Sequence, residues 1–141
     1  MSSEVGAARL MTRSAIFALQ AAMEDLPTEE KIEPHVEHHF APGCYGREIF
    51  MPAGSVVVGK IHRHAHLNVL LEGECEVVTE HERERLTAPH VWVSTPGIKR
   101  AVHNITDVRW ITFHPTEETD LTKIEAEVIA PSYDNLIEEA I

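Results

Sequence analysis

Three histidines occupy alternate positions in the segment His62-Arg63-His64-Ala65-His66. Because side chains along an extended strand repeat every two residues, we expect all three imidazoles on one face. Neutral imidazole is the commonest metal ligand that a protein offers, so the segment is a candidate site for a divalent transition metal. The alternative is a His-rich surface strand, since the chain has ten histidines in 141 residues.

Two glycines, Gly54 and Gly73, flank this segment at a spacing that matches a known pattern. The first cupin motif reads G-x5-H-x-H-x3-E-x6-G, and the chain keeps its register, with Lys60 at the first His position and His66 at the Glu position. A match to the second motif, G-x5-P-x-G-x2-H-x3-N, begins after fifteen intervening residues. Its five positions hold Pro89, Thr95, Gly97, Arg100 and Asn104.

Over about residues 40–116 the chain therefore resembles the cupin superfamily, with five of the ten motif positions identical. It is also similar to uncharacterised cupin-like proteins of tailed phages, which implies no known activity. The cupin resemblance implies an all-β fold, a double-stranded β-helix (jelly-roll) barrel, here over residues 35–116. Turn residues divide that segment into short pieces. The expected strands are 46–51, 55–62, 67–71, 75–80, 90–94, 100–104 and 108–114.

Helical patterns lie on both sides of the barrel. Apolar residues recur at helical spacing over 9–26 and Pro27 ends that helix, so residues 1–34 are interpreted as an N-terminal helix and linker. Residues 117–141 form an acidic, helical tail in which Thr119 or Asp120 caps a helix ending before Pro131, and Ser132 caps a second short one. The first helix is amphipathic enough to pack on the barrel or on a partner subunit, and small cupins often dimerise, so we expect a homodimer.

The cupin resemblance implies two His and one Glu ligand from the first motif and one His ligand from the second, all pointing into the barrel. In this chain those positions hold Lys60, His62, His66 and Arg100. Lys and Arg side chains have no lone pair for a metal, so two of the family's ligands remain, and two ligands alone make a poor site. His64 shares the parity of the two remaining histidines and is a further possible ligand.

A third ligand is available at His114, in the last expected strand. In an antiparallel barrel this strand can face the first-motif strand, and His114 points inward if Ile111 and Phe113 pack under the helices. A triad of His62, His66 and His114 suits Zn²⁺, Mn²⁺, Fe²⁺ or Ni²⁺ and leaves positions open for a substrate. The alternative is that His114 ends its strand and bonds a backbone carbonyl.

Lys60 and Arg100 indicate a second kind of ligand. Both occupy places where the family points His into the barrel, and two cations buried together need an acidic side chain, a bound anion or water. Glu48 is such an acid if its face of the strand is the inner one, and a solvated Glu48 is the equal alternative. We therefore expect a pocket for a small anionic molecule, a carboxylate or sugar acid, beside the histidines.

Composition narrows the class of protein. With 23 acidic and 12 basic residues the formal net charge is −11, which disfavours nucleic-acid binding. No apolar run is long enough to span a membrane and no signal-peptide pattern opens the chain, so we expect a cytoplasmic protein. Cys44 and Cys75 do not make a disulfide framework, and a small buried side chain is the favoured role for each.

Two functions fit these observations. The first is a metal-dependent enzyme acting on a small molecule, in which the metal acts as a Lewis acid or activates oxygen or water. The second is a non-catalytic module, a ligand-binding or phage accessory structural protein whose metal site has been lost. Cations at two ligand positions favour the module, whereas the His cluster favours metal binding. Whether the chain is an enzyme is left open by the sequence.

Overall fold

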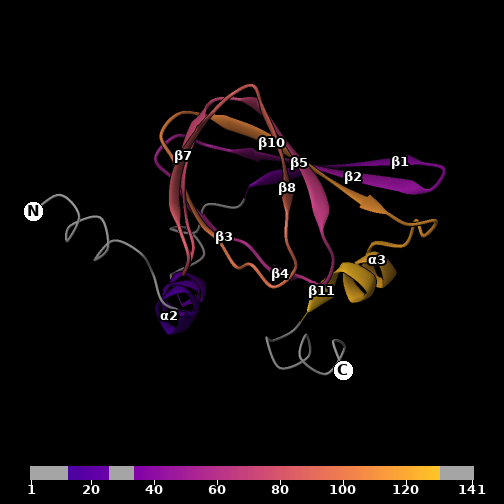
Figure 1. The fold of residues 1–141 in the computed structure, drawn as a ribbon, viewed down its shortest axis with the longest axis horizontal. Helices are drawn as coiled ribbons and strands as arrows, with labels where there is room; N and C mark the ends of the chain where they lie inside the picture. The colour runs from indigo at the N-terminus through magenta and orange to yellow at the C-terminus, as the bar shows by residue number, and fades with distance from the viewer. Residues whose placement is uncertain (1–12, 26–33, 131–141) are drawn as a thin grey trace, which may run out of the picture.

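The computed structural model describes residues 13–25 and 34–130, in which two helices and eleven strands are found (Figure 1). In chain order these elements are α2 (Arg13–Glu24), β1 (His35–Ala41), β2 (Cys44–Met51), β3 (Val56–Val58), β4 (Ile61–His62), β5 (His66–Glu72), β6 (Glu74–Val78), β7 (Arg83–Thr87), β8 (His90–Ser94), β9 (Ala101–Asn104), β10 (Val108–Pro115), α3 (Leu121–Val128) and β11 (Ile129–Ala130).

The strands form two larger antiparallel sheets and one short pair. The five-stranded sheet has the order β1-β2-β10-β5-β8, and the four-stranded sheet has the order β3-β9-β6-β7. β11 pairs with β4 as a separate two-stranded ribbon. The all-β architecture with accessory helices that the sequence predicts is confirmed.

The apolar core is built from side chains of both large sheets. Strand alternation points these residues inward, and they are buried: Met51, Leu70, Cys75, Val77, Leu86, Val102, Val108 and Trp110. Trp92 lies edge-on against Trp110, with ring centroids 4.9 Å apart. The same alternation decides which polar side chains share the interior with this core.

Three strands are not among those predicted: β1, β7 and the short β11, which lies in the segment expected to be helical. β1 reads HVEHHFA and β7 reads RERLT, so neither has a clear apolar alternation. Each lies at the edge of a sheet and pairs with one neighbour, β2 or β6. Edge strands expose one side and commonly have charged side chains, which is why a hydrophobic pattern does not find them.

The predicted strand 55–62 is broken in the structure. β3 and β4 lie on either side of Gly59-Lys60 and belong to different sheets. At the break the Gly59 N–H donates a hydrogen bond to the carbonyl of Arg100 at 2.9 Å. The alternation of inward and outward side chains along β3 therefore does not continue to His62.

The helices agree with the sequence where the structure describes them. α2 lies within the predicted helix 9–26 and against β3, with Ile16 buried. Asp120 caps α3, because its carboxylate accepts hydrogen bonds from the backbone N–H groups of Thr122 and Lys123. Residues 9–12, most of the linker and the helix expected at Ser132 lie outside the described residues. Neither α2 nor α3 is long and apolar enough to cross a membrane.

Gly73, in the turn from β5 to β6, requires a glycine for two reasons. Its φ is +93°, and a Cβ atom there would lie 2.1 Å from the carbonyl oxygen of Asp107. Gly54 also has a positive φ, +82°, but a Cβ atom there would meet nothing within 4 Å. A substitution at Gly54 therefore tests the backbone conformation alone, whereas a substitution at Gly73 adds a steric clash.

We expect Gly73→Ala to destabilise the fold more than Gly54→Ala. The left-handed conformation alone costs an alanine about 1–2 kcal/mol, and the clash with the Asp107 backbone adds to this at Gly73. Urea unfolding of both variants measures the two losses. Equal losses would show that the Asp107 segment moves aside freely.

Candidate functional site

His62, His66 and His114 meet inside the barrel. His62 ends β4, His66 begins β5 and His114 lies near the end of β10. Their ring centroids are 4.2 Å (His62 to His66), 5.3 Å (His62 to His114) and 5.0 Å (His66 to His114) apart. Three strands thus bring together the three imidazoles that the sequence indicates as a triad.

The position of His62 depends on the C-terminal segment. β11 pairs with β4 so that Ile129 lies opposite His62. The backbone N–H of Arg63 donates to the carbonyl of Val128 at 2.8 Å, and Nε of Arg63 donates to the carbonyl of Ile129 at 2.9 Å. Residues beyond the last barrel strand therefore fix one member of the triad.

Burial disfavours the charged form of all three imidazoles. Desolvation, followed by the proximity of His66 and His114, lowers the pKa of His62 to about 3. Desolvation also lowers the pKa of His114 to about 4, and it lowers the pKa of His66 against the effect of a backbone hydrogen bond. In the part of the chain that the structure describes, Nδ1 of His62 and Nε2 of His66 are buried and have no hydrogen-bond partner.

Arg100 is a cation of this interior, as the sequence predicts. Its guanidinium donates a hydrogen bond to the Ser94 hydroxyl, and its charge contributes to the lowered pKa values of His62 and His66. Burial lowers the pKa of Arg100 itself, although its ordinary value is so high that it stays charged. A positive charge therefore lies beside neutral imidazoles.

Buried polar side chains connect Arg100 to the apolar core. Nε1 of Trp110 donates to Oδ1 of Asn68 at 3.1 Å, and Nδ2 of Asn68 donates to Oγ of Ser94 at 2.6 Å. Asn68 and Ser94 are both buried. Because an unpaired buried polar group is costly, this chain of hydrogen bonds fixes where the guanidinium lies.

Lys60 does not point into the barrel, so that expectation was wrong. Its side chain is 58% exposed and forms an ion pair with Glu125 on α3. The break between β3 and β4 shifts the alternation, which leaves Lys60 outside although His62 is inside. With Arg63 and Lys99 it lines an outer pocket of about 500 Å³, to which α2 and α3 also contribute residues.

His64 lies apart from the buried rings. The chain bends at residues 63–64, and the side chain of His64 is exposed. Its backbone carbonyl lies 3.5 Å from Nδ1 of His66. The expectation that His64 shares the inner face assumed an extended strand, and the bend removes that assumption.

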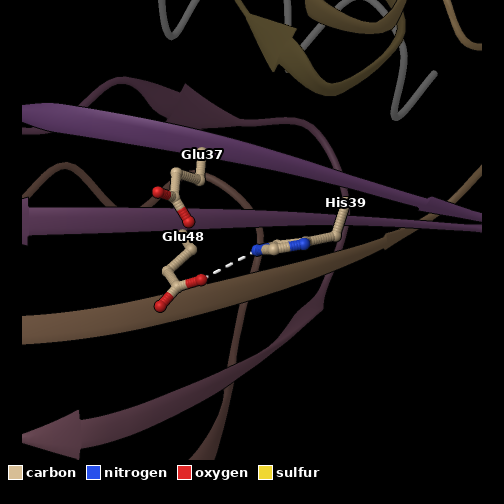
Figure 2. Close-up of side chains that lie close together, drawn as sticks. All are labelled: Glu37, His39 and Glu48. Atoms are coloured by element: carbon tan, nitrogen blue, oxygen red, sulfur yellow. Dashed lines mark hydrogen bonds and ion pairs between the residues drawn. The ribbon is translucent and has the colours of Figure 1, made fainter.

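Glu48 lies on the outer face of β2, so its expected role beside an inner cation was wrong. Its cross-strand neighbours are Glu37 on β1 and Ile111 on β10. The buried carboxylate forms an ion pair with Arg109 and is 2.7 Å from Nε2 of His39 (Figure 2). Desolvation raises the pKa of Glu48, but the hydrogen bonds with Arg109 and His39 outweigh it and leave the pKa below its ordinary value.

Glu37, His39 and Glu48 form a second group that can be considered for a metal ion. Their potential ligand atoms all lie within 4.8 Å of one another (Figure 2). Among the described residues, the ring nitrogens of the interior triad are farther apart than this. The Glu48 carboxylate is already engaged by Arg109 and His39, however. The unpartnered nitrogens of the triad, Nδ1 of His62 and Nε2 of His66, are buried, and neither makes a hydrogen bond that ligation of a metal would break. The donor set of the interior therefore fits a metal better.

Two further side chains lie on the inward-facing side of β2: Tyr45, which is buried, and Arg47, which is exposed. Tyr45 lies opposite His114, with ring centroids 6.2 Å apart, and its hydroxyl is 2.6 Å from Nδ1 of His38. The charge of Arg47 contributes to the lowered pKa of His114. The sequence pattern assigns no role to either residue. Both share strand parity with the core residue at the end of β2, which is the signal that identifies them.

Comparison with known proteins identifies the fold. No family model matches the sequence, and no curated protein is similar to it. Ectoine synthase from P. lautus is 14% identical with a TM-score of 0.56, over 74% of this chain and 80% of that one. An RmlC-like cupin family protein with a double-stranded β-helix fold, from Methanocaldococcus jannaschii, is 12% identical with a TM-score of 0.50, over 65% of this chain and 88% of that one.

A third solved structure is a larger protein, of which one part is similar to this chain. Salicylate 1,2-dioxygenase from Pseudoaminobacter salicylatoxidans, in adducts with gentisate, is 13% identical with a TM-score of 0.56. The match covers 84% of this chain and 35% of that one. At such identities the likenesses concern the fold alone, and none of them bears on the phage resemblance.

We expect the metal-free protein to lose stability as the pH falls from about 6.5 toward 4. Histidines of the unfolded chain titrate near about 6.5, whereas the pKa of His62 in the folded protein is about 3. The unfolded state therefore binds more protons than the folded state between these two pH values. The free energy of unfolding declines as the pH falls through this range, by about 2 kcal/mol at pH 5 for such a histidine.

Urea unfolding of the chelator-treated protein at pH 7 and pH 5 measures this loss. His62→Asn should reduce the loss, and His103→Asn, at an exposed position, should leave it unchanged. An undiminished loss in His62→Asn would mean that the His62 imidazole accepts a proton in the folded state.

Proposed function

We propose that this chain, which has the cupin fold, binds one divalent transition metal ion through His62, His66 and His114 and holds a small anionic molecule beside it through Arg100. The observation that carries the proposal is the pair of buried imidazole nitrogens without a partner, Nδ1 of His62 and Nε2 of His66, next to a third imidazole from β10. A buried acceptor without a partner costs free energy, and ligation of a metal removes that cost.

The interior residues have distinct roles in this proposal. The lowered pKa values keep the imidazoles of His62 and His114 in the unprotonated form that ligates a metal. A bound divalent metal supplies Lewis acidity toward an oxygen atom of a ligand. Arg100 presents a planar guanidinium to a carboxylate, and the hydroxyl of Ser94 holds the guanidinium in place.

Charge favours an anionic ligand in this interior. Arg100 and Arg47 both lower the pKa of His62, and no carboxylate of the described residues is among the groups that shift it. A small organic acid can place its carboxylate on Arg100 and a second oxygen atom toward the histidines. The dioxygenase of the same fold was solved with gentisate, which is a small molecule of comparable kind.

A second candidate function is a non-catalytic ligand-binding or phage accessory structural module without a metal. The observation that favours it is the charge of Arg100, which acts on His62 and His66 and opposes a second cation there. Arg100 also stands where the second cupin motif has its His ligand. In such a module the anion pocket remains and the three histidines are structural.

We expect protein purified without a His-tag and reconstituted with Zn²⁺, Mn²⁺, Fe²⁺ or Ni²⁺ to retain about one ion per chain, measured by elemental analysis. His62→Ala, His66→Ala and His114→Ala should each weaken retention at least about tenfold, because two remaining ligands do not complete a site.

His39→Ala is the matched control, because it removes a histidine of the second group and leaves the interior intact. If His39→Ala abolishes retention and the triad variants do not, the metal belongs to the outer group. If no metal is retained after reconstitution, the non-catalytic module is the function that remains.

We expect small carboxylates to stabilise the protein in thermal-shift measurements, and Arg100→Met to weaken their binding by about 10-fold to 100-fold. That is the effect of losing one charge-assisted, bidentate contact. Lys60→Met removes the same charge outside the barrel and should leave binding unchanged. Loss of binding in Lys60→Met with retention in Arg100→Met would place the anion in the outer pocket.

A further inference from the structure

The outer pocket is a second hollow of the molecule, apart from the barrel interior. Its volume is about 500 Å³, and small-molecule sites in proteins commonly have volumes of roughly 300–1,000 Å³. In Figure 1 the ribbon of β4 and β11 lies between α2 and α3, and residues of all four elements line the pocket. None of the three interior histidines is among the described residues that line it. The outer pocket is therefore a candidate site for a ligand of its own.

Basic side chains outnumber acidic ones in the outer pocket. Among the described residues that line it, Lys60, Arg63 and Lys99 are basic and Glu125 is acidic. The lining thus has two more positive than negative charges, whereas the whole chain has a formal net charge of −11. A hollow lined by one sign of charge concentrates ions of the opposite sign. This local reversal of charge favours an anionic ligand.

Lys99 gives the outer pocket a positive charge at a fixed position. The residue is only 5% exposed, which is rare for a lysine. Its Nζ donates a hydrogen bond to the carbonyl of Gly59 at 3.1 Å and lies 4.7 Å from the centre of the Phe17 ring. A charge that is largely removed from water interacts with an anion more strongly than a solvated surface lysine does. The wall is therefore built around a cation and is more than a patch of mobile lysines.

The remaining lining favours a ligand that also has an apolar part. Apart from the charged side chains and Gln20, the described lining residues are apolar: Phe17, Ile61, Ala126, Ile129 and Ala130. Removal of such a surface from water by a ligand is favourable. A bare ion would contact the cations alone, whereas an anion with an apolar body contacts both parts of the pocket.

We propose that the outer pocket binds a small organic anion whose head group has two negative charges, a phosphate monoester, attached to an apolar body. A phosphate monoester has nearly two negative charges at neutral pH, which matches the excess of two positive charges in the lining. Its three oxygen atoms accept hydrogen bonds from the ammonium and guanidinium groups. The body covers the apolar wall beside Phe17.

A ligand in the outer pocket also acts on the position of His62. Nε of Arg63 donates to the carbonyl of Ile129 at 2.9 Å, and Ile129 pairs with His62 across the β4–β11 ribbon. Both Arg63 and Ile129 line the pocket, so a bound anion contacts both strands and stabilises their pairing. The anion and the metal should therefore strengthen each other's binding. This coupling rests on the proposed function, whereas binding of the anion does not.

Isothermal titration of the metal-free protein with phenyl phosphate tests the site. We expect one equivalent to bind, and inorganic phosphate and phenol to bind at least about tenfold more weakly, because each lacks one half of the ligand. Lys99→Met should weaken binding of phenyl phosphate at least about tenfold. Ala126→Trp, at an exposed position of α3, fills the pocket, should have the same effect and replaces Lys99→Met if that variant does not fold. Glu125→Gln should strengthen binding, because it removes the acidic side chain of the lining.

Lys123→Met is the matched control, because it removes the same charge from an exposed residue of α3 that is not among those lining the pocket. This variant and Arg100→Met should bind phenyl phosphate as the wild type does. Absence of binding by the wild type, or loss of binding in Arg100→Met with retention in Lys99→Met and Ala126→Trp, would overturn the proposal.

The coupling is measured by repeating the titration with the metal-loaded protein. Phenyl phosphate should bind at least about threefold more tightly than to the metal-free protein. Equal affinities would overturn the coupling and leave the site established by the first titration. If the protein retains no metal, the proposed function fails, and the titration of the metal-free protein still decides whether the outer pocket binds the anion.

Discussion

The side-chain amide of Asn68 joins the two parts of the barrel interior. Its oxygen accepts from the indole of Trp110, which belongs to the apolar core, and its nitrogen donates to Ser94, which holds Arg100. Both ends of the amide are satisfied without water, so the apolar and the polar part of the interior share a fixed boundary. The position of Arg100 relative to His66 depends on that boundary, and with it the charge that the histidines experience.

Strand geometry divides the basic residues that cluster along the sequence. Arg100 faces the histidines, whereas Lys60, Arg63 and Lys99 line the outer pocket. Lys99 and Arg100, which are adjacent in the sequence, thus lie on opposite sides of the barrel wall. The interior therefore contains one guanidinium from this cluster, whereas the motif positions imply two cations. One buried charge has a smaller desolvation cost than two, so less favourable interaction is needed to compensate for it.

The signals that indicate the triad are local: the spacing of the first motif and the parity of the last strand select His62, His66 and His114, whose rings lie close together in the structure. The break at Gly59-Lys60 is not local, because it depends on a hydrogen bond to the distant carbonyl of Arg100.

Orientation and edge pairing limit the prediction in a similar way. Both faces of β2 have apolar residues, so only the pairing with β1 and β10 shows that Glu48 lies outside. The edge strands β1 and β7 are defined by their partners and lack a hydrophobic period of their own.

The pairing of β11 with β4 has a consequence for the order in which the interior is assembled. All three histidines of the triad have been synthesised by residue 114, yet within residues 13–25 and 34–130 the strand partner of β4, which ends in His62, is the segment 129–130. A nascent chain can therefore close its two large sheets before His62 has a neighbouring strand. The geometry of the triad therefore depends on residues outside the two large sheets, because His66 and His114 have strand partners in the five-stranded sheet whereas His62 pairs with the C-terminal segment.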